Sequence, residues 1–322
     1  MGDFDLFKLI RDEMEIVEAR LYENVDTPET LLYEASTHLI KAGGKRMRPG
    51  FALLAARMYQ DDISYAIPLA TALELVHMAT LVHDDVIDNS SIRRGTGTVK
   101  CLWGNRISIY AGNFVFAKAL AIIAEYKRSD ILEVIADASM KICEGEIVQM
   151  LSCYNVNLGL KNYLRRIERK TALLISLSCQ VGAMLSTSDS RQIEALRRYG
   201  YDLGLAFQIT DDILDFVADE ETLGKPIGSD IRQGVITLPA LYALHHDEHR
   251  DELARLLSSP QECQQSTEHI IDMVCESDGI EYAYSVSQHY ANRSKRHLEL
   301  LPDTPVKETL RELADFILAR DY

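Results

Sequence analysis

The chain has 322 residues, of which 47% are hydrophobic, and its formal net charge at pH 7 is −15. This composition is typical of a globular protein with a sizeable core and excludes global disorder. The 49 acidic residues outnumber the 34 basic ones, which argues against a nucleic-acid-binding protein that depends on phosphate contacts. An anionic ligand must therefore meet local positive charge or a metal ion.

Helical periodicity dominates the chain and predicts an all-α fold, because alternating strand patterns are nearly absent. The predicted helices cover 51–59, 66–88, 107–126, 131–151, 162–185 and 190–217, and several amphipathic ones run from about 236 to the end. Loops are expected where Gly, Pro, Ser, Asn and Asp gather, at 41–49, 89–98, 186–190, 219–230 and 245–249. None of these loops resembles an interdomain linker, so a single helical domain is expected over 1–322.

The N-terminus is acidic and amphipathic, unlike the basic and then apolar pattern of a secretory signal. No uninterrupted apolar run approaches the roughly 20 residues that a membrane-spanning helix needs. The six cysteines are scattered without a CxxC pair, which indicates reduced thiols. These features predict a soluble, cytoplasmic protein and leave a peripheral membrane contact open.

Two short motifs, HDDVID at 83–88 and TDDILD at 210–215, repeat one arrangement of aspartates at positions i, i+1 and i+4. The two triads are Asp84, Asp85 and Asp88, and Asp211, Asp212 and Asp215. On a helix these positions point to about 0°, 100° and 40°, so the carboxylates crowd onto one side and repel one another. A solvated acidic face would explain one such motif alone. The apolar flanks, the repetition and the bases that follow each motif instead favour Mg²⁺, which selects oxygen ligands and leaves positions for phosphate.

Basic residues lie close to these motifs in the sequence. The segment GGKRMRP at 43–49 places Lys45, Arg46 and Arg48 at a helix start, which is a ready anion site. Arg93 and Arg94 follow the first triad, Lys225 follows the second, Lys170 and Thr171 open an apolar helix, and His77 lies about 20° around the helix from Asp84. Each feature alone has an ordinary alternative, such as a flexible loop, a surface arginine or a packed histidine.

Together, six segments resemble the trans-isoprenyl diphosphate synthases, and in particular the catalytic chains of their long-chain bacterial branch. They are GGKRMRP, LVHDDVIDNSSIRRG, GNRISIYAGN, EGEIVQ, RKTALL and GLAFQITDDILDF with LGKPIGSD, in this order. The resemblance implies a helical bundle around a central cavity. It also implies condensation of isopentenyl diphosphate with an allylic diphosphate, farnesyl diphosphate, to a long all-trans product of about heptaprenyl length for quinone side chains.

The resemblance also implies roles for single residues. The six aspartates would hold about three Mg²⁺ ions that grip the allylic diphosphate. The diphosphate of isopentenyl diphosphate would be bound by Lys45, Arg48, His77 and Arg94. The allylic partner would be contacted by Arg93, Lys170, Gln208 and Lys225, with Lys170 among the catalytic residues and Thr171 shielding the cation region.

Ala79 and Thr80, one turn before the first triad, would wall the pocket that sets product length, and their small size implies a long product. One departure concerns the loop RQGVIT at 232–237. Many relatives carry a lysine or asparagine there, but Val235 cannot supply a charge. We therefore expect no charged contact from Val235 to substrate.

Other classes of protein share parts of this pattern. His83 and Asp84 resemble the HD signature of helical phosphohydrolases, but the nine histidines cluster mainly at 245–249 rather than converging as ligands. A terpene cyclase normally lacks the second aspartate motif and the GGKR loop, and a non-catalytic subunit would have lost its aspartates. A shorter-chain farnesyl or geranylgeranyl synthase stays open, as does the choice between a homodimer and a heterodimer with a small non-catalytic subunit.

Overall fold

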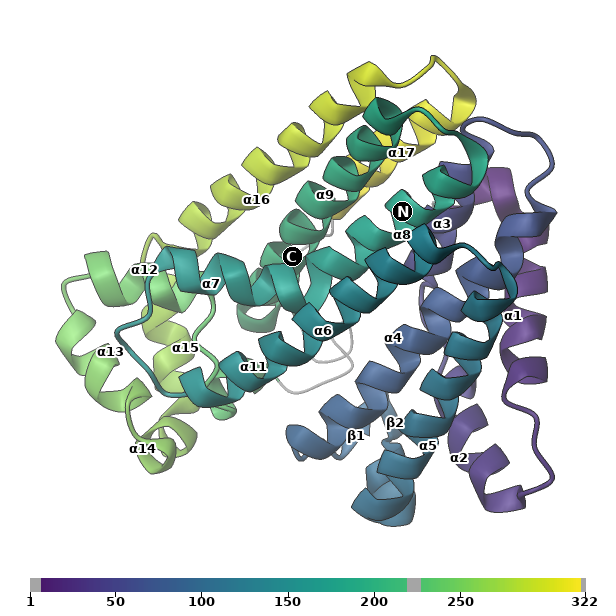
Figure 1. The fold of residues 1–322 in the computed structure, drawn as a ribbon. Coiled ribbons are helices and arrows are strands. Elements are labelled where there is room, and N and C mark those ends of the chain that lie inside the picture. The colour runs from purple at the N-terminus through teal and green to yellow at the C-terminus, as the bar shows by residue number, and fades with distance from the viewer. Residues whose placement is uncertain (1–6, 219–226, 320–322) are drawn as a thin grey trace. The chain divides into compact units, whose positions relative to one another are not determined.

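The computed structural model describes residues 7–218 and 227–319. Nearly all regular structure in them is helical (Figure 1), which confirms the predicted all-α class. The chain divides into two compact units. The first contains Met1–Ala136, Leu177–Arg197 and Leu300–Leu310, and the second contains Asp137–Ser176, Arg198–Glu299 and Arg311–Tyr322. The single domain expected from the sequence stays a prediction.

The first unit is built around α4 (Ile67–Ile87). Its other long elements are α1 (Arg11–Asn24), α2 (Thr30–Lys41), α3 (Met47–Arg57) and α5 (Val99–Glu125), with 3₁₀ turns η1 (Lys8–Ile10) and η2 (Ser64–Ala66). Helix α4 contacts α1, α3 and α5, and Figure 1 shows it beside α5. Most residues of α4 are buried, as expected of a helix that is apolar all round and forms a core.

The predicted loop at 89–98 contains a small hairpin. Strands β1 (Ile92–Arg93) and β2 (Thr96–Gly97) pair antiparallel, with Ile92 opposite Gly97 and Arg93 opposite Thr96. The turn residues Arg94 and Gly95 have φ of 51° and 73°, the positive values that a favoured two-residue hairpin turn requires. Strands of two residues are too short for alternation to reveal them in the sequence.

Helix α5 begins at Val99, eight residues before the predicted start at 107. The Thr98 side chain accepts a hydrogen bond from the backbone N–H of Cys101 (3.1 Å) and caps the helix. The backbone then leaves helical geometry at Gly104, where φ is 78° and ψ is 167°. Because of this interruption, the residues before Gly104 do not continue the helical periodicity, and the sequence pattern does not reveal the first turn of α5.

Four helices contribute residues to both units: α6 (Ser129–Ser152), α8 (Leu173–Ser186), α9 (Ser190–Val217) and α17 (Pro305–Leu318). Helix α9 has the predicted bounds, 190–217. The predicted helix at 162–185 is divided into α7 (Leu160–Ile167), the π-helical turn η3 (Glu168–Ala172) and α8. Such π turns are frequent at functional sites, and this one carries Lys170 and Thr171.

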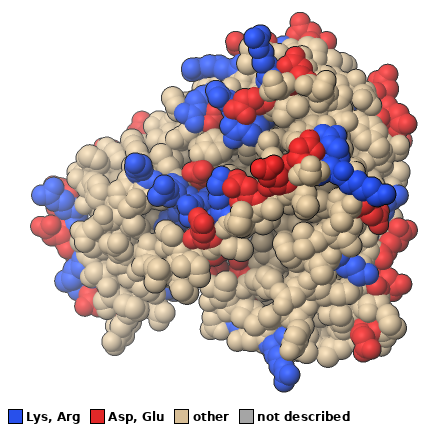
Figure 2. Space-filling view, viewed as in Figure 1, with Lys and Arg blue, Asp and Glu red and all other residues tan. Residues whose placement is uncertain are grey.

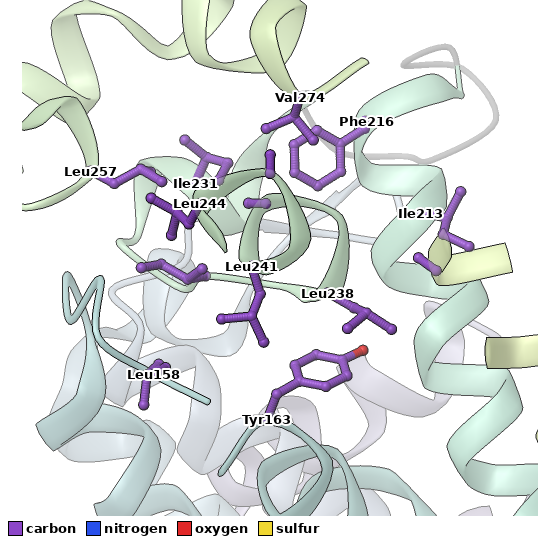
Figure 3. Close-up of a cluster of buried hydrophobic side chains, with 14 of the residues drawn as sticks. Leu158, Tyr163, Ile213, Phe216, Ile231, Leu238, Leu241, Leu244, Leu257 and Val274 are labelled. Atoms are coloured by element: carbon purple, nitrogen blue, oxygen red, sulfur yellow. The ribbon is translucent and has the colours of Figure 1, made fainter. Parts of the chain in front are cut away.

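The remaining elements belong to the second unit up to Glu299. They are α11 (Ser229–Arg232), α12 (Leu238–His246), α13 (Arg250–Leu257), α14 (Pro260–Gln265), α15 (Thr267–Glu276), α16 (Gly279–His297) and η4 (Leu298–Leu300). Figure 3 shows their apolar core, in which Leu238, Leu241 and Ile231 meet Tyr163 of α7 and Phe216 of α9. Each fully buried side chain of this size contributes roughly 1.5–3 kcal/mol, so this core fixes the end of α9.

Two helical segments, Ser64–Ile87 and Val99–Glu125, are long and apolar enough on average to cross a membrane, although the sequence has no uninterrupted apolar run of that length. In the first, 72% of the apolar window is buried inside the protein, against 39% in the second. A core helix of a soluble protein passes the same test, so the pair is weak evidence for a membrane protein.

Candidate functional site

The first aspartate triad lies at the C-terminal end of α4. Asp88 is the C-cap residue, and its backbone N–H donates to the carbonyl of Asp84. A helix C-terminus carries negative partial charge, so three carboxylates there need a cation. Asp85 is only 1% exposed and accepts from Arg93 Nε at 2.8 Å. Burial raises the pKa of Asp85, and Arg93 opposes this rise.

The second triad also lies at the end of its helix, since α9 ends at Val217. The Asp212 carboxylate is buried and accepts from Tyr163 Oη at 2.7 Å and from Gln208 Nε2 at 2.8 Å. Burial and the nearby charge of Asp230 raise the pKa of Asp212 to about 7, against the effect of these hydrogen bonds. Asp212 is therefore held by protein donors on both oxygens.

The last aspartate of the second triad, Asp215, is fully buried. It accepts from Ser229 Oγ at 2.9 Å and from the backbone N–H of Asp230 at 3.0 Å. Asp215 thus ties the start of α11 to the end of α9. Asp211, by contrast, is exposed, so the three carboxylates of this motif differ in what they can reach.

The two triads share one pattern within their own units. The middle residue of each, Asp85 or Asp212, is buried and bound by protein donors, whereas the first residue, Asp84 or Asp211, is more accessible. Over residues 7–218 and 227–319, no group of three or more His, Cys, Asp or Glu side chains converges enough to hold an ion alone. Mg²⁺ is commonly bound by one or two carboxylates together with waters and substrate phosphates, and the residues present fit an ion of this kind.

The loop before α3 is organised by Arg46 rather than by its neighbours. Arg46 has φ of 46° and is 8% exposed, and its guanidinium binds Glu18 at 2.8 Å and Glu74 at 3.2 Å. Lys45 is exposed and Arg48 is half-buried on either side of it. The ion pairs of Arg46 therefore fix the backbone between Lys45 and Arg48, the two bases of this loop that are predicted to bind diphosphate.

His77 lies among four arginines. Burial and the charges of Arg48, Arg94, Arg93 and Arg46 lower its pKa well below the ordinary value. The imidazole is therefore neutral and able to donate one hydrogen bond without adding charge. A concentration of guanidinium groups around a neutral donor suits a multiply charged anion such as a diphosphate.

Arg94 reaches this group from the hairpin turn. A Cβ on Gly44 would lie 2.5 Å from its Nη1, so the guanidinium packs directly on the Gly44 backbone. Desolvation by the surrounding protein lowers the pKa of Arg94, and the negative charge of Glu74 opposes this effect. Predicted residues 48, 77, 93 and 94 thus lie near one another and near Asp85 of the first triad, and Lys45 directly follows Gly44, on which Arg94 packs.

The second unit gathers another set of predicted residues. Thr171 Oγ1 donates to Gln208 Oε1, and Gln208 in turn donates to Asp212. The exposed Lys170 donates from Nζ to Gln149 Oε1 at 3.3 Å. A Cβ on Gly204 would lie 2.5 Å from the Ala172 Cα, so the π turn and α9 are in direct backbone contact. This contact ties the position of Lys170 to that of the triad.

Three predicted features stand apart. Lys225 lies outside the described residues. Val235 is 9% exposed, in keeping with a packing residue. Ala79 is buried at 1% exposure, and Thr80 Oγ1 donates to the carbonyl of His77. The roles of Ala79 and Thr80 in product length stay predictions.

Sequence reasoning missed several supporting residues, namely Glu18, Glu74, Tyr163, Ser229 and Asp230. Glu74 left a trace in the sequence, because it is an isolated acid inside the apolar stretch 66–82. Tyr163 left none, since its contact with Asp212 spans 49 positions along the chain.

A cavity of about 460 Å³ opens in the first unit beside Arg128, Asp130 and residues 184–188. None of the predicted site residues lines it. It lies where the start of α6 meets the end of α8 and the start of α9.

Known proteins resemble this chain over nearly its whole length. Residues 29–274 match the family model described as Polyprenyl synthetase. Heptaprenyl diphosphate synthase component 2 of Geobacillus stearothermophilus is 42% identical over 98% of both chains, and octaprenyl diphosphate synthase of Escherichia coli is 34% identical over 98% of both. The crystal structure of heptaprenyl diphosphate synthase from Staphylococcus aureus superposes with a TM-score of 0.91 at 36% identity, covering 97% of this chain and 99% of that one.

A second structure, polyprenyl synthase from Caulobacter crescentus complexed with calcium and isoprenyl diphosphate, superposes with a TM-score of 0.93 at 35% identity, covering 98% of this chain and 97% of that one. These matches and the two aspartate motifs agree with one another. The chain belongs to the polyprenyl synthetase family and is a trans-prenyl diphosphate synthase.

Proposed function

We propose that this enzyme extends farnesyl diphosphate with isopentenyl diphosphate to all-trans heptaprenyl diphosphate for quinone side chains. The observation that carries the product length is the likeness to two heptaprenyl diphosphate synthase components 2, at 42% and 40% identity. The small, buried Ala79 one turn before the first triad supports it. Octaprenyl and short-chain synthases at 34% and 37% identity make product length the part to be tested.

In the proposed reaction, the C–O bond of the allylic diphosphate breaks and its electron pair leaves with the diphosphate. The double bond of isopentenyl diphosphate attacks the allylic carbon, a new C–C bond forms, and a proton is lost from the adduct. Bound Mg²⁺, about three ions, would act as Lewis acid for the departing diphosphate. The chain's own residues bind, orient and exclude water, and no protein nucleophile is needed.

The six aspartates are proposed to divide this task. Asp84, Asp88 and Asp211 are the more accessible carboxylates and would take the metal directly. Asp85, Asp212 and Asp215 are buried and already bound by protein donors, so they would align the triads and add negative charge behind the ions. We propose that all six aspartates serve the allylic diphosphate, with Arg93, Lys170, Gln208 and Lys225 as further contacts to it.

The metal-free diphosphate of isopentenyl diphosphate is assigned to Lys45, Arg48, His77 and Arg94. Support comes from the lowered pKa of His77 beside several arginines, because a neutral donor within a cationic group favours an anion. Thr171, which donates to Gln208, would shield the allylic cation.

We further propose that the enzyme works in the cytoplasm with a partner chain, either a second copy or a small non-catalytic subunit. The word "component" in the names of two relatives supports a partner chain. Helix α5 exposes Leu102, Ile109, Tyr110 and Leu120, and Figure 2 shows few charged side chains on the surface over this helix. Several large apolar side chains exposed on one helix commonly mark a protein interface.

The direct test is to incubate the purified chain with farnesyl diphosphate, radiolabelled isopentenyl diphosphate and Mg²⁺, and to measure product length by chromatography. We expect condensation that EDTA abolishes and a heptaprenyl product. Asp84→Asn and Asp211→Asn should each lose activity, while Asp251→Asn, at a fully exposed aspartate, should keep it.

Other outcomes distinguish the alternatives. A product of farnesyl or geranylgeranyl length would assign a shorter-chain synthase. Activity that appears only on addition of a small subunit would assign an obligate heteromer. Phosphate release from diphosphate esters without C–C bond formation would contradict the proposal in favour of a phosphohydrolase.

A further inference from the structure

A histidine side chain of helix α2 contacts the hairpin that carries Arg93 and Arg94. His38, in the last turn of α2, lies 2.6 Å through Nε2 from the carbonyl oxygen of Gly97. Because a carbonyl can only accept, the imidazole donates through Nε2–H. The same ring meets the ring of Trp103 edge-on, with centroids 5.4 Å apart and an interplanar angle of 79°.

The Gly97 carbonyl is available for this bond because of the hairpin register. The backbone N–H of Thr98 donates to Ser91 at 3.0 Å, so these two residues form a hydrogen-bonded pair. Hydrogen-bonded and non-hydrogen-bonded pairs alternate along an antiparallel ladder, and the next pair is Ile92 with Gly97. The Gly97 carbonyl therefore points away from β1, toward the outer edge that His38 meets.

A hairpin of this size does not hold its own geometry. Two short strands alone are marginally stable in water, and Arg94 has a positive φ of 51° that costs a residue with a side chain roughly 1–2 kcal/mol. Arg93 and Arg94 must nevertheless reach Asp85 and the Gly44 backbone, respectively. An external contact on the outer edge supplies the missing constraint.

We propose that His38 is a positioning residue for diphosphate binding. By donating to Gly97 and packing against Trp103, it fixes the 92–97 hairpin so that Arg93 and Arg94 are held in position to bind diphosphate. Trp103 lies in the first turn of α5, one residue before the break at Gly104, and its ring contact holds the His38 imidazole in place. The inference rests on the proposed function, because the roles of Arg93 and Arg94 in diphosphate binding belong to it.

Two substitutions separate the hydrogen bond from the packing. His38→Gln keeps an N–H donor near the Nε2 position, whereas His38→Phe keeps a ring beside Trp103 and removes the donor. His289→Phe, at an exposed histidine that also meets an aromatic ring edge-on at 5.6 Å, is the matched control. All are compared in the full-length enzyme with its partner chain if one is required.

We expect H38F to raise KM for isopentenyl diphosphate about five- to tenfold, the factor that corresponds to one neutral hydrogen bond, with a smaller change in kcat. Amide hydrogen exchange of residues 91–98 should become faster at an unchanged Tm. Because Trp103 is the one tryptophan in the chain, its emission can follow a titration with inorganic diphosphate, whose half-saturation should shift by a similar factor. H38Q and H289F should resemble the wild type.

Wild-type exchange of 91–98 and wild-type KM in H38F would overturn the proposal, as would an H38Q variant impaired as strongly as H38F. If H38F does not fold, His38→Asn replaces it, because the asparagine amide reaches the Nδ1 position and not Nε2. A wild-type enzyme that binds diphosphate but forms no C–C bond would refute the proposed function. The hydrogen-exchange comparison would still decide the role of His38.

Discussion

At the scale of single residues, the second triad depends on a side chain outside the motif. Tyr163 is 1% exposed and donates to the buried Asp212 at 2.7 Å. Burial drives the pKa of Asp212 upward, and the hydroxyl opposes that rise by stabilising the carboxylate. Tyr163 therefore helps to keep a negative charge at a position where desolvation disfavours it.

Tyr163→Phe should weaken the metal site while leaving the fold intact. Loss of a hydrogen bond to a charged group costs about 1.5–3 kcal/mol, and the pKa of Asp212 should rise further. We expect a lower free energy of unfolding in urea and a higher Mg²⁺ concentration for half-maximal activity. Tyr65→Phe is the control, because the Tyr65 hydroxyl has no hydrogen-bond partner among the described residues. Equal Mg²⁺ requirements in the two variants would count against this role of Tyr163.

At the scale of elements, the loop between α2 and α3 is held by a buried ion pair. Glu74 of α4 is 2% exposed and binds Arg46, and Glu18 of α1 binds the same guanidinium. Removing one partner of a buried pair typically costs 3–5 kcal/mol, whereas replacing both by apolar groups is often neutral. The pair therefore fixes where the loop lies more than it stabilises the protein.

Arg46→Met should lower the free energy of unfolding by about 3 kcal/mol, because it leaves Glu74 as an uncompensated buried charge. The double variant Arg46→Met with Glu74→Met should recover most of that loss. Urea unfolding of both single variants and the double variant gives the coupling free energy. A double variant as unstable as the single one would contradict this account.

The two glycines of the same loop offer a matched comparison. Both have positive φ, 73° at Gly43 and 141° at Gly44, but a Cβ at Gly43 meets nothing within 4 Å and one at Gly44 overlaps the Arg94 guanidinium. Gly44→Ala should displace Arg94 and raise KM for isopentenyl diphosphate. Gly43→Ala carries backbone strain without this displacement, so it should affect stability more than KM. Identical KM values for the two variants would show that Arg94 is not displaced or not needed.

The elements differ in how far the sequence predicts them. The periodicity predicts α9 at its observed bounds, because it is regular over all 28 residues. The hairpin at 92–97 and the start of α5 were missed, since they depend on turn conformations at Arg94 and Gly104 rather than on periodicity. The motifs identified the candidate residues. Their partners Tyr163 and Glu74 depend on tertiary packing, which one sequence does not reveal.

At the scale of the whole molecule, the exposed apolar face of α5 bears on assembly. Ile109 and Leu120 are 45% and 40% exposed, and eleven residues of separation place them about 20° apart around the helix. A stable interface buries roughly 800 Å² per partner, and apolar side chains along the part of α5 that follows the break at Gly104 can supply a large part of it.

Ile109→Lys combined with Leu120→Lys should therefore weaken association, because two charges would be buried without partners. Sedimentation velocity should show a smaller species, with or without an added small subunit. Ile16→Lys is the control, since Ile16 of α1 is also 45% exposed but lies on a different helix. Unchanged sedimentation of the α5 double variant would exclude this face as the contact.

The proposal that both triads act on one diphosphate can be tested by coupling between them. A ligand that binds only the folded protein stabilises it by about 2.7 kcal/mol at a hundred times its Kd, so Mg²⁺ with inorganic diphosphate should raise the Tm of the wild type. If one ligand joins the triads, Asp84→Asn and Asp211→Asn should each remove most of this rise. The double variant should then lose little more, because the two substitutions delete the same bound state. Additive losses, with each single variant keeping about half of the stabilisation, would instead indicate two independent sites, one at each triad.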